Sequence, residues 1–144
     1  MYNFKWDKYN SDVFFDAKKL RELVFILEQG FKEEFDDYDK TCDHLVMYDE
    51  KNNPIATARV ILNYQGKKVS KVGRIVVTKE LRKNGLGRLL LKEVEKFSKK
   101  NGMLCTQLGA QMQAFDFYKK LGYNEYGVQY LEESTPHIDM LKIL

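Results

Sequence analysis

The sequence predicts a single α/β domain over residues 1–144, built on a mixed, mostly antiparallel seven-stranded sheet with helices on both faces. The first observation is length, because 144 residues is about the size of one domain and no Pro/Gly/Ser-rich linker divides the chain. The second is periodicity, since seven short segments have the apolar pattern of strands and three have helical spacing. The third is order: two helical segments stand between strands as crossovers, whereas the other strands follow one another in hairpins.

The first half of the chain is predicted to contain four strands and one helix. A helix from Asp12 to Glu28, ended by Gly30, is indicated by apolar residues at helical spacing. Those apolar residues are Leu20, Leu23, Val24 and Leu27. A turn at Asn52-Asn53-Pro54 and a hairpin at Gln65-Gly66-Lys67 join the later strands. The four strands are Asn3 to Lys8, His44 to Tyr48, Ile55 to Asn63 and Val69 to Thr78.

The second half is predicted to contain two helices and three strands. The longer helix runs from Asn84 to Lys100 and ends at Asn101-Gly102. Its apolar stripe consists of Leu86, Leu90, Val94 and Phe97. A shorter helix, Gln111 to Leu121, stops at Gly122. The three strands are Met103 to Leu108, Tyr123 to Leu131 and His137 to Ile143, and the last two are expected to form a hairpin.

Positive charge is concentrated in the middle of the chain. The net charge is only +3, which is too mild to predict a nucleic-acid-binding protein. Residues 51–100, however, contain 14 Lys or Arg and only 3 Asp or Glu. Such a concentration indicates an anionic partner, which could be a phosphorylated cofactor, nucleic acid, or only solvent and salt over a helix face. No nucleic-acid-binding motif accompanies it, so no nucleic-acid partner is expected.

Neither a membrane nor a metal partner is expected from the sequence. The longest uncharged stretch, Asn101 to Phe115, is too short to cross a bilayer. The first twelve residues lack the basic start and apolar run of a signal peptide, so we expect a cytoplasmic protein. Cys42 and Cys105 lie far apart without the spacing of metal ligands, which favours two reduced thiols and no metal site.

The most informative segment is Gly73 to Arg88, where an apolar strand enters a basic, glycine-bearing turn and then a helix. Gly85 and Gly87 allow backbone N–H groups to approach a ligand, and the first turn of a helix has unpaired N–H donors and a positive dipole end. The segment therefore has the properties of an anion cradle suited to a pyrophosphate. It matches neither the phosphate-loop nor the dinucleotide-binding pattern, and a plain helix start with two glycines is the alternative.

Several motifs together resemble one enzyme superfamily. The run Arg82-Lys83-Asn84-Gly85-Leu86-Gly87 resembles the acetyl-CoA-binding motif of the GNAT superfamily of N-acyltransferases. The segment Phe115 to Tyr123 resembles that superfamily's next motif, in which a helical tyrosine precedes a Gly-aromatic pair. Arg21 to Phe25 with Glu28-Gln29, and Pro136 to Met140, resemble the YjcF/ElaA-like branch. The C-terminal half is also similar to glyphosate N-acetyltransferase.

The resemblance implies an acetyl-CoA-dependent N-acetyltransferase whose sheet splays to form the cleft for its cosubstrate. Backbone groups of the strand would hold the pantetheine arm and thioester, and the following loop would surround the pyrophosphate. Dimers are common in this superfamily, so a homodimer is a further expectation. The cofactor-binding residues implied in this way are Ile75, Val76, Val77, Arg82, Lys83, Asn84, Gly85, Leu86, Gly87 and Arg88.

Acyl transfer to an amine needs a neutral nucleophile, a donor to the developing oxyanion and an acid for the leaving thiolate. By similarity, Tyr118 would protonate the CoA thiolate, although a core tyrosine is the alternative. His137 would serve as base or substrate contact, although a hydrogen-bonded histidine near a strand end is the alternative. The oxyanion donor would be the backbone N–H of Val76 or Val77. Neither cysteine has a partnered base in sequence, which favours direct attack by the amine.

The resemblance also implies where the acceptor amine binds. Arg21 and Arg74 match arginines that hold acidic substrate groups in glyphosate N-acetyltransferase, but each could instead pair with an acid such as Glu28, Asp36 or Asp39. Gln111 stands where that enzyme has a third arginine, so the anion pocket is weaker, and Arg59 would compensate if it points into the cleft. The segment Glu33 to Asp39 is either a lid over the acceptor or a solvated loop.

We therefore expect a small amine acceptor that carries a carboxylate and contacts Arg21, Arg74, Gln111 and His137. Two other functions are consistent with the same residues. A protein lysine or N-terminal amine would be the acceptor if the cleft were open and lined by acids. A non-catalytic acyl-CoA sensor would bind the cosubstrate and release no thiol.

Overall fold

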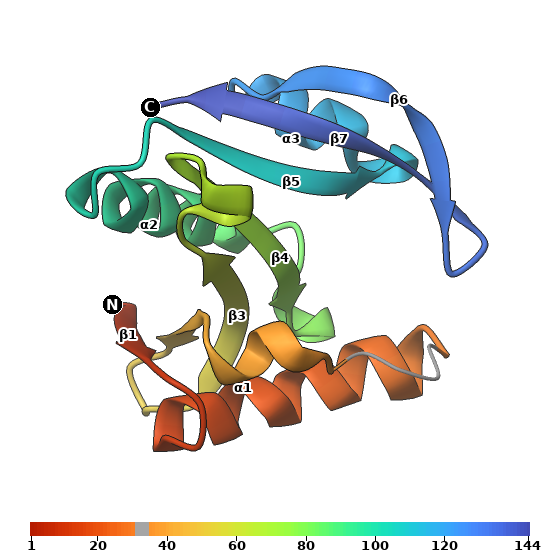
Figure 1. Cartoon of the computed structure of the whole chain (residues 1–144). Helices are drawn as coiled ribbons and strands as arrows, with labels where there is room; N and C mark the ends of the chain where they lie inside the picture. Colours follow the sequence, from red (N-terminus) through yellow and green to blue (C-terminus); the bar gives the residue numbers. More distant parts are fainter. Residues whose placement is uncertain (31–34) are drawn as a thin grey trace.

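Seven strands form one sheet in the order β1-β2-β3-β4-β5-β7-β6 (Figure 1). The computed structural model describes residues 1–30 and 35–144. Only the β4–β5 pair is parallel among the described strands, which confirms the predicted mixed and mostly antiparallel sheet. The strands are β1 Asn3–Asp7, β2 Asp43–Tyr48, β3 Pro54–Ile61, β4 Val69–Val77, β5 Cys105–Gln111, β6 Asn124–Glu132 and β7 Thr135–Ile143.

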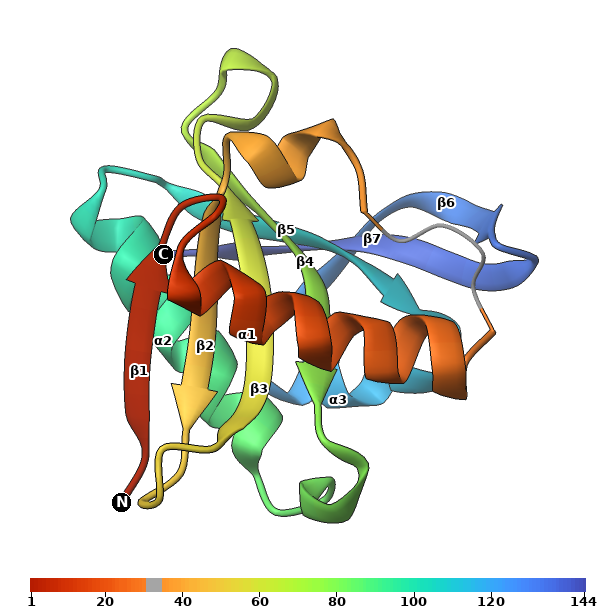
Figure 2. The same cartoon turned by 90° about the horizontal axis from the view of Figure 1, so that it is seen from below.

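Helices cover both faces of the sheet, as predicted (Figure 2). Helix α1, Asp12–Arg21, crosses one face over β2, β3 and β4 and continues as a π-helical segment, Glu22–Glu28. Helices α2, Leu86–Lys100, and α3, Phe115–Lys120, lie on the other face. Strand β2 contributes to both cores by alternation, because Leu45 and Met47 pack in the core that includes α2 whereas Val46 and Tyr48 pack in the core under α1.

The first helix has the predicted extent but not the predicted apolar face. Leu20 and Val24 are buried, whereas Leu23 and Leu27 are 52% and 76% exposed. The cause is a change of winding, since the Gln29 N–H donates to the Val24 carbonyl five residues earlier at 2.9 Å. A turn that takes more than four residues no longer keeps α-helical spacing on one face.

The boundary between β5 and α3 corrects the predicted strand Met103 to Leu108 and helix Gln111 to Leu121. Antiparallel pairing with β7 continues as far as Gln111 opposite His137, and this pairing keeps Gln111 in the strand. A 3-10 turn, Met112–Ala114, follows before α3 begins. Local apolar spacing could not reveal how far a partner strand from the end of the chain extends.

The sheet splays between β4 and β5, and this feature positions the functional site. The two strands pair only over Val69–Val72 and Cys105–Leu108, after which β4 follows β3 and β5 follows β7. At the divergence β4 has a bulge, because Thr57 pairs with Val76 and Arg59 with Gly73, which leaves Ala58 opposite both Arg74 and Ile75. Arg74 adopts a left-handed conformation with φ of 51°.

Candidate functional site

A cavity of about 530 Å³ opens where the two halves of the sheet diverge. One wall comes from β3 and β4, and the opposite wall from β5, α3 and the β6–β7 hairpin. Phe25 and Gln29, from the π-helical segment and the residue after it, add a third side. The cavity also collects Arg74, Gln111 and Tyr118, which the sequence analysis had singled out from three different elements.

The end of β4 presents backbone groups toward the splayed side. The Thr78 N–H donates to the Ile55 carbonyl of the β3 side at 3.0 Å. By alternation, the backbone of Val76 faces β3 and those of Ile75 and Val77 face away from it. The Nε of Arg82 donates to the Val77 carbonyl at 3.0 Å, in agreement with that direction. Of the two predicted oxyanion donors, the Val77 N–H is thus directed toward the splayed edge, and the Val76 N–H toward β3.

Helix α2 begins without a side-chain cap in the described part of the chain. Gly85 is the N-cap residue with φ of 78°, and Lys83 before it also has a positive φ of 70°. This backbone path leaves the N–H groups of the first helical turn for a ligand. The side chain of Leu86 is buried in the core and fixes the helix start. A Cβ at Gly87 would lie 3.2 Å from the Cζ of Phe117, so glycine lets α3 pack closely against α2.

Arg82, which is predicted to lie beside the pyrophosphate, also donates three hydrogen bonds within the protein. Its Nη1 and Nη2 donate to Oε2 and Oε1 of Glu28 at 2.6 and 3.1 Å, while its Nε binds the Val77 carbonyl. Hydrogen bonding to Arg82 holds the pKa of Glu28 below its usual value. Glu28 was a candidate partner of Arg21 or Arg74 in the sequence, and in the structure it pairs with Arg82. The remaining predicted loop residues Lys83 and Asn84 are exposed, and so is Arg88.

Tyr118 lies on α3 at the edge of the cavity. Its ring contacts those of Phe117 and Tyr123 edge-on, with centroids 5.1 and 6.0 Å away. Burial raises the pKa of the Tyr118 phenol to about 12. The phenol therefore keeps its proton at neutral pH, which a group that donates to a leaving thiolate requires.

His137 is buried at the third position of β7 and also lines the cavity. Its Nδ1 lies 2.7 Å from the Thr135 carbonyl, and since a carbonyl only accepts, Nδ1 carries the proton. The neutral ring therefore has its lone pair on Nε2, 3.5 Å from Oε2 of Glu132. The Tyr130 ring lies 20° from parallel to the imidazole, at a centroid distance of 5.8 Å. This arrangement suits a proton acceptor.

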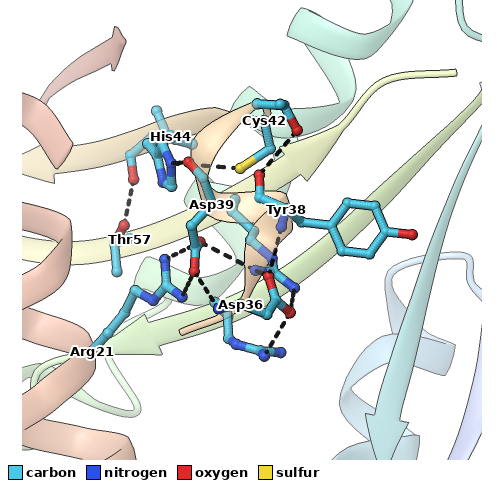
Figure 3. Close-up of polar contacts among 11 residues, drawn as sticks. Arg21, Asp36, Tyr38, Asp39, Cys42, His44 and Thr57 are labelled. Atoms are coloured by element: carbon cyan, nitrogen blue, oxygen red, sulfur yellow. Dashed lines mark hydrogen bonds and ion pairs between the residues drawn. The ribbon is translucent and has the colours of Figure 1, made fainter. Parts of the chain in front are cut away.

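A buried ion-pair network joins helix α1 to β3 (Figure 3). Arg21 donates to both oxygens of Asp39 at 2.8 and 3.0 Å and is only 1% exposed. Arg59 donates to Asp36 at 2.6 and 2.9 Å and to Asp39 at 3.1 Å. Arg21 is thus in the ion pair with Asp39 that the sequence left open as the alternative, and it is not among the described residues that line the cavity, so it has no place in the acceptor site proposed below.

Arg74 has a different position from Arg21. It lines the cavity, and its Nη2 lies 3.3 Å from Oδ2 of Asp36. Arg59 lines the same wall, as the sequence analysis required for it to compensate for the missing third arginine, and its Nε is buried without a hydrogen-bond partner among residues 1–30 and 35–144. Gln111 faces the cavity as well, and its Oε1 accepts from Gln113, which leaves its amide N–H groups as donors.

Asp39, Cys42 and His44 offer atoms within 4.8 Å of one another, the spacing of a metal site, beside the ion-pair network (Figure 3). The protonation of Cys42 and His44 favours a role in packing over metal binding. Burial raises the pKa of the Cys42 thiol to about 11 and lowers the pKa of His44, whose Nε2 lies 2.9 Å from the Asp39 carbonyl oxygen. The Asp39 carboxylate is already bound by two arginines. Burial also raises the pKa of Cys105, so neither thiol is a ready nucleophile.

The acidic segment Glu33 to Asp39 is only partly covered by the structure. Glu33 and Glu34 lie outside the described residues, whereas Asp36 and Asp39 pair with arginines and form a capping box at the 3-10 turn Asp37–Lys40. Sequence reasoning missed Glu132, which approaches His137, and Tyr130, whose Oη donates to Asp139 at 2.7 Å. The register of the β6–β7 hairpin would have been the signal, because it pairs Tyr130 with His137.

Comparisons with known proteins agree with this geometry. Residues 15–144 match the family model described as an acetyltransferase (GNAT) domain. The chain is 37% identical over 133 residues to the uncharacterized protein YyaT of Bacillus subtilis strain 168, covering 88% of this chain and 86% of that one. It is 35% identical over 136 residues to the uncharacterized N-acetyltransferase YjcF of the same strain, covering 92% and 94%. The crystal structure of Escherichia coli ElaA shares the fold, with a TM-score of 0.88 at 23% identity over 99% of both chains.

Proposed function

The chain belongs to the GNAT acetyltransferase family, and from that premise we propose that it acetylates a small amine that also carries a carboxylate. Family membership makes it an N-acyltransferase with acyl-CoA as cosubstrate. The observation that carries the acceptor class is the polarity of the cavity. Arg59, Lys71 and Arg74 line the wall from β3 and β4, whereas Glu132 and Glu133 line the wall from the β6–β7 hairpin.

The residues present fit acetyl-CoA, which supplies an activated acetyl thioester when bound. The outward-facing backbone of Ile75 and Val77 offers the hydrogen-bonding edge that a pantetheine arm requires. The uncapped first turn of α2 after Gly85 offers N–H donors to a pyrophosphate. Gly87 contributes close packing against Phe117 rather than a side chain.

The proposed mechanism is direct attack of the amine on the thioester carbonyl. His137 Nε2 first accepts a proton from the bound ammonium, which leaves the neutral amine that attacks. The nitrogen loses its second proton to solvent once the new C–N bond has formed. The Val77 N–H donates to the oxygen on which negative charge develops. As the C–S bond breaks, Tyr118 gives its phenolic proton to the thiolate. The protonated thiols of Cys42 and Cys105 support a route without a covalent enzyme intermediate.

The charges across the cavity orient the acceptor in this proposal. The acceptor carboxylate binds at Arg74 beside the amide of Gln111, and Glu132 attracts the amine, as an ammonium, toward His137. Asp36 already pairs with Arg59 and Arg74, so it offsets part of the positive charge on that wall. The remaining charge favours a single carboxylate over a more highly charged anion such as a phosphate.

The test measures thermal stability with acetyl-CoA, followed by thiol release with a panel of amines. Acetyl-CoA at about 100 times its dissociation constant should add about 2.7 kcal/mol of stability. Amino acids should be acetylated at least about tenfold faster, by kcat/KM, than their methyl esters, which lack the carboxylate charge. Preference for the esters or for lysine peptides would contradict the proposed acceptor. Stabilisation without thiol release would identify an acyl-CoA sensor.

A further inference from the structure

One guanidinium joins the two ligand sites of this chain. The Nε of Arg82 donates to the carbonyl of Val77, the last residue of β4, at 3.0 Å. Its other two nitrogens bind both carboxylate oxygens of Glu28, the last residue of the π-helical segment, at 2.6 and 3.1 Å. Arg82 itself lies in the loop that leads to α2. The end of the first helix, the end of β4 and the start of the cofactor loop therefore meet at one side chain.

This contact differs from an ordinary surface ion pair. Isolated exposed pairs contribute little because water screens them and both side chains lose rotamer freedom. Here the side chains of Arg82 and Glu28 are only 35% and 32% exposed, and the pair is bidentate. The third bond to a backbone carbonyl fixes the plane of the guanidinium, so Glu28 meets a partner that is already oriented.

The contact also fixes a peptide plane beside the expected thioester position. The carbonyl of Val77 and the N–H of Thr78 belong to the same planar peptide unit. Ile55 accepts from that N–H at 3.0 Å on one side, and Arg82 donates to the carbonyl at 3.0 Å on the other. With this plane held from both sides, the orientation of the preceding Val77 N–H is restricted. Phe25 and Gln29, which flank Glu28, form part of the cavity wall.

We propose that Glu28 is a positioning residue for acyl transfer, which acts through Arg82 to hold the end of β4 and the helical wall of the cavity in register. This inference rests on the proposed function. It assigns Arg82 a role that does not depend on the pyrophosphate. Under the alternative, Arg82 is chiefly a pyrophosphate ligand, and Glu28 competes with the pyrophosphate for the guanidinium.

The experiment compares two acyl donors. Acetyl-CoA carries the pyrophosphate, whereas S-acetylpantetheine has the same thioester and arm without it. Glu28→Gln should lower kcat/KM about tenfold with both donors, relative to the unsubstituted chain with the same donor. Glu80→Gln is the matched control, because Glu80 is an exposed carboxylate of the neighbouring 3-10 turn Lys79–Leu81 with no ion pair among residues 1–30 and 35–144. It should leave both values unchanged.

A second variant separates positioning from general destabilisation. Arg82→Lys keeps the positive charge but cannot bind Glu28 and Val77 together, so it should lower kcat/KM with both donors as Glu28→Gln does. Because Glu28 acts through Arg82, the kcat/KM of the double variant should lie less than about twofold below that of Arg82→Lys alone. If the losses of kcat/KM in the two single variants multiply in the double variant, the inference is overturned. Thermal unfolding of each variant confirms that kinetics are measured on folded protein.

Three other outcomes would overturn the role inferred for Glu28. If Glu28→Gln leaves S-acetylpantetheine turnover unchanged and improves acetyl-CoA turnover, Arg82 serves the pyrophosphate and the inference is overturned. An unsubstituted chain that is active, with Glu28→Gln equally active for both donors, overturns the inference alone. An unsubstituted chain that transfers acetyl from neither donor overturns the proposed function and this inference with it.

Discussion

The buried carboxylate of Asp39 allows a prediction with a magnitude. Asp39 accepts two hydrogen bonds from Arg21, one from Arg59 at 3.1 Å and one from the Asp36 backbone N–H at 3.0 Å. Asp39→Asn keeps nearly the same volume but removes the negative charge. Two arginines that are 1% and 6% exposed would then lie together with less compensation.

The pKa shift of Asp39 and the general cost of breaking a buried ion pair give similar values for the free energy of unfolding lost in Asp39→Asn. Burial opposes ionisation of Asp39, but the hydrogen bonds and charge of Arg21 outweigh it and lower the pKa from 3.8 to about 2. That difference corresponds to about 2.5 kcal/mol of stability at neutral pH. Removal of one partner from a buried ion pair costs about 3–5 kcal/mol in general. We expect a loss of about 3 kcal/mol, which lowers the Tm of a 144-residue chain by about 10 °C.

The pH dependence gives this prediction its sign. Because the pKa of Asp39 is lower in the folded chain, its stabilisation is present above the unfolded pKa of 3.8 and disappears as the pH falls through about 2. Asp39→Asn has no such titration, so its stability difference from the unsubstituted chain should shrink by about 1 kcal/mol between pH 7 and pH 3. Urea unfolding at several pH values measures this difference. Asp37→Asn, at an exposed site in the same turn, is the control.

Either of two results would refute the reasoning. An Asp39→Asn variant as stable as the unsubstituted chain at pH 7 would mean that the arginines do not depend on the Asp39 charge. A stability difference that stays constant from pH 7 to pH 3 would mean that it comes from packing and not from ionisation.

Three further predictions concern the reaction, each measured by thiol release. Tyr118→Phe should lower kcat about a hundredfold with little change in the KM for acetyl-CoA, because only the proton for the thiolate is lost. His137→Gln should lower kcat about a hundredfold at pH 7, and much of the rate should return at pH 10, where the amine needs no base. Arg74→Gly should raise the KM of carboxylate-bearing acceptors about tenfold without lowering the Tm, since glycine relieves the positive φ. An unchanged kcat in Tyr118→Phe or His137→Gln would count against the proton-transfer role of that residue. An unchanged acceptor KM, or a lowered Tm in thermal unfolding, would count against the role proposed for Arg74.

The order of elements and the glycine-bearing start of α2 were predictable because their signals are local. Apolar periodicity marks the strands and α2, and Gly85 stands at a left-handed position that glycine favours. No helix in the described part of the chain is long and apolar enough to cross a membrane. Long-range pairing was not predictable in the same way. Arg82 and Glu28 are 54 positions apart, and which acid meets which arginine depends on the path of the loop between helix and sheet.

Arg21 and Arg74 show why residue type alone could not separate an arginine in a buried ion pair from one that lines the cavity. Both interrupt apolar surroundings in the sequence, and the difference between them lies in backbone geometry. Arg21 lies at the end of α1 over the sheet, where it donates to the Asp39 carboxylate of the capped 3-10 turn. Arg74 lies at the bulge of β4, and its left-handed conformation costs about 1–2 kcal/mol relative to glycine. That bulge occurs where β4 leaves β5 and the backbone edge of Val77 begins to open. One distortion of the strand, at Arg74 and Ile75, therefore lies beside the backbone edge proposed for the acyl donor and directs a cation into the cavity proposed for the acceptor, which ties the two halves of the proposed site to one bulge.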